Sequence, residues 1–164
     1  MKIEEKLITV EQLAALKPNE LIRLGVGCMK LVLSDERYEI SMGGWHQPIY
    51  KDDNPIPIIC QVCMAGAVMA KSLGCDPRLS YSPGFFEGEY VESRVYSASH
   101  AAYDPLHAIN NFREGDVWDG LETLGLVGDV TNELDRIIVE YAASPDKFFE
   151  QMEKLADDLE AAGY

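Results

Sequence analysis

The longest apolar stretch of the chain, residues 56–70, limits what the chain can fold into. Pro57 and Gln61 interrupt it, and it is shorter than the roughly 20 residues that a membrane-spanning helix needs. Pro57 suits the first turn of a helix, and Gly74 suits a position just beyond its end. We therefore predict a helix over residues 58–73 that is apolar on every side and forms the centre of the fold.

Small side chains in this predicted helix allow another backbone to approach it closely. We expect Gly66 to contact such a backbone, so that a larger side chain at this position would overpack the core. Lys71 is expected to face solvent, because lysine is almost never fully buried unless it is paired.

The rest of the sequence predicts a mainly α-helical, α+β domain that comprises all of residues 1–164. Thr9 and Gln12 have the spacing of a capping box and predict a short helix after Thr9. Residues 20–33 are apolar on almost every side, so they form either a second central helix or a helix that turns into a buried strand. Loose alternation and paired glycines predict a small β-hairpin or sheet near residues 37–50.

Helical signals are clearer in the last third of the chain. Asp104 and Pro105 predict a helix start, and Gly115 predicts its end. Further helices are expected over residues 116–124 and 129–142. A final helix should begin at Ser144–Pro145, with an apolar stripe formed by Phe148, Met152, Leu155, Leu159 and Ala162.

The net charge of the chain is −14, from 28 acidic residues against 14 lysines and arginines. This balance disfavours direct binding of nucleic acid or of anionic membranes and favours a basic protein as partner. Acids on the final helix lie largely off its apolar stripe, which makes them candidate contacts for such a partner. The alternative is a solvated face that only keeps the protein soluble. The candidate contacts are Glu150, Glu153, Asp157 and Asp158.

Trp45 is a further candidate contact, because it follows two glycines in a loop. Glycines beside an aromatic residue can form a binding lip. They can equally form a turn that packs the indole into the core, which is the commoner fate of tryptophan.

Cys60 and Cys63 form the most motif-like pair in the chain. A zinc site would need two more ligands in matching geometry, and no second close pair supplies them. Apolar neighbours favour buried, unreactive thiols, so we expect no metal, no cofactor and no catalytic residue. A serine at Cys63 would then bury a hydroxyl at a cost of about 1–3 kcal/mol. The remaining zinc candidates are Cys28, Cys75, His46 and His100.

Two other classes of function stay open. A small cysteine- or histidine-dependent enzyme would use a triple such as Cys63, His100 and Asp104. A module that binds a small molecule or nucleotide would need a cationic or glycine-rich pocket, for which the candidates are the scattered residues Arg78, Arg94 and Arg113.

Two segments, CQVCMAGAVMA at residues 60–70 and AINNFREGDV at residues 108–117, resemble small proteins encoded by tailed bacteriophages. The resemblance implies a protein that acts in the bacterial host cytoplasm, which fits an N-terminus without the apolar segment of a secretory signal. It implies a role in host takeover or in countering host defence, by binding and inhibiting a host protein. A nucleic-acid-handling protein is one such target.

Overall fold

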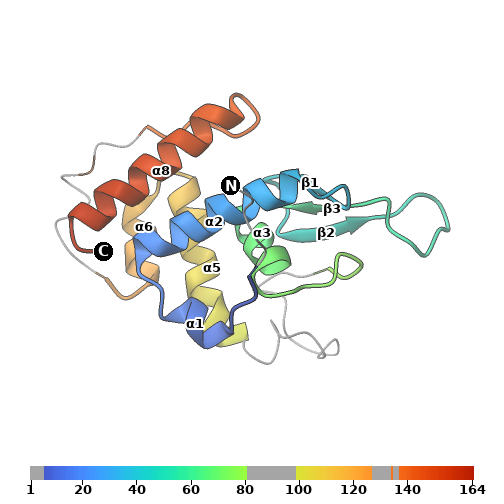
Figure 1. Cartoon of the computed structure of the whole chain (residues 1–164), viewed down its shortest axis with the longest axis horizontal. Helices are drawn as coiled ribbons and strands as arrows, with labels where there is room; N and C mark the ends of the chain where they lie inside the picture. Colours follow the sequence, from blue (N-terminus) through green and yellow to red (C-terminus); the bar gives the residue numbers. More distant parts are fainter. Residues whose placement is uncertain (1–5, 81–98, 127–133, 135–136) are drawn as a thin grey trace.

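The computed structural model describes residues 6–80, 99–126, 134 and 137–164, with the side chains of residues 99–103 left aside. The fold belongs to the α+β class, as predicted, and a small sheet lies at one end of a group of helices (Figure 1). No helix in these described ranges is long and apolar enough to span a membrane. The helices are α1 (Val10–Ala14), α2 (Pro18–Leu33), α3 (Met64–Lys71), α5 (Ser99–Arg113), α6 (Val117–Thr123) and α8 (Pro145–Ala161).

The central helix is α2, which crosses the middle of the molecule and packs against α3, α5 and α8 (Figure 1). It stays helical to Leu33, so the alternative of a terminal strand in residues 20–33 is wrong. The capping box before α1 is confirmed, because Thr9 Oγ1 accepts from Gln12 N and Gln12 Oε1 accepts from Thr9 N.

The prediction of one helix over residues 58–73 is wrong in its first half. Strand β3 (Ile59–Val62) occupies that half, and Cys63 alone separates it from α3. Every residue of α3 is buried, so this short helix still lies in the core. A short, largely apolar run suits a buried strand and a buried helix equally, and here it forms both.

The mixed sheet has the order β1–β3–β2, with β1 (Tyr38–Ile40) parallel and β2 (His46–Ile49) antiparallel to β3. A small sheet near residues 37–50 is therefore confirmed, whereas a hairpin is wrong, because β3 lies between β1 and β2. Pro48 is tolerated because β2 is an edge strand and needs no amide hydrogen there.

Gly66 contacts a backbone, as predicted. A Cβ built on Gly66 would lie 1.4 Å from the carbonyl oxygen of Trp45. Lys71 does not face solvent: it is 4% exposed, and its Nζ lies 2.6 Å from Oδ2 of Asp35. The expectation for Lys71 fails because its charge is paired inside the protein.

In the C-terminal third, α6 and α8 form as predicted, and the glycines beyond α5, α6 and α8 have positive φ angles. Asp104 and Pro105 do not begin a helix, since α5 starts at Ser99 and contains Pro105. The helix predicted over residues 129–142 is wrong where it can be compared: residues 137–140 lack regular structure and 141–143 form a turn. Its other residues, except Leu134, lie outside the described ranges.

Candidate functional site

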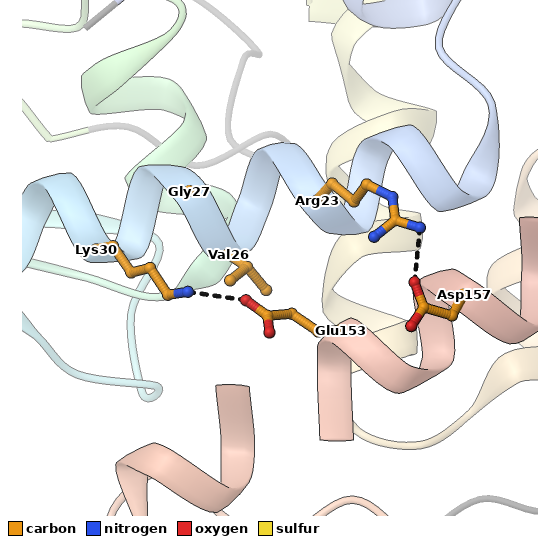
Figure 2. A pocket seen from close by; sticks show the side chains of 6 residues that line it. All are labelled: Arg23, Val26, Gly27, Lys30, Glu153 and Asp157. Carbon is orange, nitrogen blue, oxygen red and sulfur yellow. Dashed lines mark hydrogen bonds and ion pairs between the residues drawn. The ribbon is translucent and has the colours of Figure 1, made fainter. Parts of the chain in front are cut away.

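The acidic side chains of α8 divide into two groups. Glu153 and Asp157 face α2, where Lys30 Nζ lies 2.8 Å from Glu153 Oε1 and Arg23 Nη2 lies 2.8 Å from Asp157 Oδ1 (Figure 2). Arg23 also contacts Glu160 at 2.8 Å. Two of the four predicted contact residues are therefore engaged by cations of α2.

These ion pairs are solvent-exposed, with 41% of the Arg23 side chain and 70% of the Asp157 side chain accessible. Exposed ion pairs contribute about 0–1 kcal/mol each to the free energy of unfolding. These pairs therefore set the orientation of α8 on α2 but provide little of the energy that attaches it. The hydrogen bond from Arg23 to Asp157 raises the pKa of the guanidinium. Four residues of the predicted apolar stripe are buried and provide most of the attachment of α8: Phe148, Met152, Leu155 and Leu159. Ala162, the fifth, is exposed just beyond the end of the helix.

Glu150 and Asp158, the other two predicted contacts, lie differently. Asp158 forms an ion pair with Lys154 one turn earlier, at 3.0 Å. Glu150 is exposed, and within the described residues it has no hydrogen bond or ion pair. Asp146, at the start of α8, is exposed in the same way. The part of α8 available to a partner is therefore its N-terminal half.

A surface cavity of about 260 Å³ lies between the two ion pairs, lined by residues of α2 and α8 (Figure 2). Its cationic residues, Arg23 and Lys30, already face carboxylates. Arg78 and Arg113 are likewise paired, with Asp76 and Glu114. Arg94 lies outside the described residues. The paired arginines and Lys30 are neutralised by carboxylates of the same chain, so they give no support to a binding pocket for an anionic nucleotide.

The four cysteines are buried free thiols. Cys60 Sγ lies 3.5 Å from Nδ1 of His46, yet the pair is not activated for nucleophilic chemistry. Burial raises the pKa of Cys60 to about 12 and lowers the pKa of His46, so both groups are held neutral. His46 is further occupied by a hydrogen bond to the carbonyl of Leu79. Among the described residues, no group of three or more His, Cys, Asp or Glu could hold a metal ion.

Cys63, from the proposed catalytic triple, is also shielded, and burial raises its pKa. Asp104 is exposed on α5, and the His100 side chain is outside the described part. Cys63 has a structural role instead: it is the N-cap of α3, where its Sγ accepts from Gly66 N at 3.4 Å and lies 3.6 Å from Asn110 Oδ1.

These contacts change what we expect of a serine at position 63. Its hydroxyl can accept from Gly66 N and donate to Asn110, so Cys63→Ser should change the free energy of unfolding by less than about 1 kcal/mol. Cys63→Ala removes the cap and should cost about 1–2 kcal/mol. Urea denaturation of both variants checks this order, and a serine variant less stable than the alanine variant would contradict it.

Trp45 is partly buried and its side chain packs against the core. Its carbonyl oxygen accepts from Cys63 N at 3.3 Å and lies against Gly66. Trp45 therefore positions the junction between β3 and α3. These contacts favour a turn that packs the indole into the core over a loop that binds a partner.

Trp118 on α6 is a surface residue that the sequence analysis missed. It is 46% exposed, while Val117, Gly120 and Leu121 bury the opposite face of the helix. Asp119 follows it directly and Glu122 lies one turn later. In the sequence, the acidic residues around Trp118 indicate a surface position. Helical periodicity alone, however, does not distinguish an exposed tryptophan from a buried one.

Comparison of the chain with protein-family models, with curated proteins and with solved structures finds no match.

Proposed function

We propose that this protein is a non-enzymatic, acidic binding protein that attaches to a basic surface of a host protein and blocks it. In this proposal it is a bacteriophage protein that acts in the bacterial cytoplasm, in host takeover or against host defence. A nucleic-acid-handling protein fits as the target, because its working surface carries the positive charge that an acidic inhibitor needs.

The distribution of charge is the observation that supports this proposal. Most of the lysines and arginines that the structure describes are paired with carboxylates of the same chain, so they cannot offset the remaining acids. Acidic side chains on α6 and on the N-terminal half of α8 then face solvent without an ion pair to a lysine or arginine in the described ranges. The paired cations are Arg23, Lys30, Arg37, Lys71, Arg78, Arg113 and Lys154.

The test is capture of a basic partner from bacterial lysate, followed by titration of that partner against variants. We expect a quadruple variant that neutralises exposed acids of α6 and α8 to bind at least tenfold more weakly at low salt, since such charges steer and hold a cationic surface. Salt should reduce binding of the unaltered chain, because exposed charges are screened within about 8 Å at physiological ionic strength. The variant carries Asp119→Asn, Glu122→Gln, Asp146→Asn and Glu150→Gln.

A matched control distinguishes the effect of where the acids lie from the effect of the total charge of the protein. Glu11→Gln, Glu36→Gln, Asp52→Asn and Asp53→Asn neutralise four exposed acids elsewhere on the chain and should leave affinity within about twofold. Equal losses in both quadruple variants, or no basic protein retained by the unaltered chain, would overturn the proposal. Glu153 and Asp157 are kept in both variants because they align α8.

A further inference from the structure

The outward face of α6 combines a half-exposed indole with carboxylates that, among the described residues, form no ion pair. Trp118 projects from the first turn, beside Asp119 and one turn before Glu122. Within the described residues, neither of these two carboxylates lies in an ion pair with a lysine or arginine. On α8, by contrast, Glu153 and Asp157 are matched by cations of α2.

Within the described residues, no lysine or arginine forms an ion pair with the carboxylates of this face. Asp116 caps α6 by accepting from Asp119 N at 3.1 Å. The hydrogen bond and charge of Asp116, together with the charge of Glu122, raise the pKa of Asp119. The nearby His107 acts in the opposite direction, but more weakly. An arginine or lysine brought to this face would relieve the repulsion among the carboxylates.

We propose that this face of α6 is the docking surface for the basic partner, and that an arginine-bearing segment of that partner lays a guanidinium on Trp118 while Asp119 and Glu122 accept its hydrogen bonds. The inference rests on the proposed function and specifies where the partner binds. Charge complementarity selects this occupant: a guanidinium stacks on tryptophan and pairs with carboxylates at the same time. Exposed tryptophans also contribute disproportionately to protein–protein binding.

The surface can be tested without knowing the partner, by using a capped peptide of six arginines as the probe and a capped peptide of six citrullines as its neutral counterpart. Titration into the full-length protein, followed by calorimetry at low salt, should show binding of the arginine peptide only. Trp118→Ala should weaken that binding about fivefold, the factor that corresponds to roughly 1 kcal/mol for an exposed cation–π contact. The double variant Asp119→Asn, Glu122→Gln should weaken it about tenfold.

The control is the double variant Asp52→Asn, Asp53→Asn in the loop between β2 and β3, which changes net charge equally and should alter affinity less than twofold. Circular dichroism and thermal melting verify that each variant is folded. Trp118→Phe keeps an aromatic face and should recover part of the affinity. Equal losses in the α6 double variant and the Asp52→Asn, Asp53→Asn control, or no effect of Trp118→Ala, would overturn the inference.

The same variants distinguish this inference from the proposed function. A captured basic protein that binds the α6 variants as tightly as the unaltered chain would refute the α6 surface and leave the proposed function standing. Probe binding that depends on α6, with no basic protein captured from lysate, would support the surface and count against the proposed host target.

Discussion

Gly66→Ala is expected to lower the free energy of unfolding by about 3 kcal/mol or more, at the upper end of what overpacking costs. The added Cβ would lie 1.4 Å from the carbonyl oxygen and 2.5 Å from the carbonyl carbon of Trp45. Both atoms belong to backbone, which cannot rotate away as a flexible side chain can. Relief requires α3 to separate from the residues before β2, which breaks the bond from Cys63 N to Trp45 O.

Two other glycines provide matched controls, because both lie inside α2 and receive the same substitution. A Cβ at Gly27 would meet nothing within 4 Å, so Gly27→Ala should stabilise the protein by about 0.5–1 kcal/mol through helix propensity. A Cβ at Gly25 would lie 2.4 Å from Cε of Met64, the end of a flexible side chain, so the effect should fall between the other two. Chemical denaturation measures all three, and a Gly66→Ala variant as stable as the unaltered chain would show that α3 does not approach Trp45 closely.

The close contact at Gly66 was predictable, whereas its context was not. Small residues in an apolar run indicate close backbone approach in any packed core. The apolar run, however, has Gln61 as its one polar residue, and a single polar residue does not distinguish the strand β3 from the helix α3. The change from strand to helix depends on β1 and β2 pairing on either side of β3, and local sequence does not encode those neighbours.

The final helix shows the same division between local and distant causes. Its apolar stripe and caps are local signals, and α8 forms where they predict. Which of its acids remain available depends on α2: Arg23 and Asp157 are 134 residues apart in the chain, and Lys30 and Glu153 are 123 apart. Sequence reasoning placed these acids on the surface correctly, yet it could not show that part of that surface pairs with α2.

Asp35→Asn is expected to cost about 3 kcal/mol, because it removes the carboxylate charge opposite a buried ammonium. The Lys71 side chain is 5% exposed and the Asp35 side chain 16%, so water can replace little of the lost interaction. The Tyr38 ring, with its centroid 5.2 Å from Lys71 Nζ, still faces the ammonium and limits the loss. Arg37 and Lys71 hold the pKa of Asp35 well below its usual range, so its contribution to stability is present above about pH 4 and is lost as the pH falls further.

A double-mutant cycle separates the buried pair from its exposed neighbour. Arg37 contacts the same carboxylate, but 63% of its side chain is accessible, so Arg37→Gln should cost no more than about 1 kcal/mol. Lys71→Met removes the buried charge and keeps a side chain of similar length. The double variant Asp35→Asn, Lys71→Met should therefore recover most of the stability that Asp35→Asn alone loses. Denaturation at pH 7 measures each corner of the cycle. If Asp35→Asn costs no more than Arg37→Gln, the burial of Lys71 does not depend on this carboxylate.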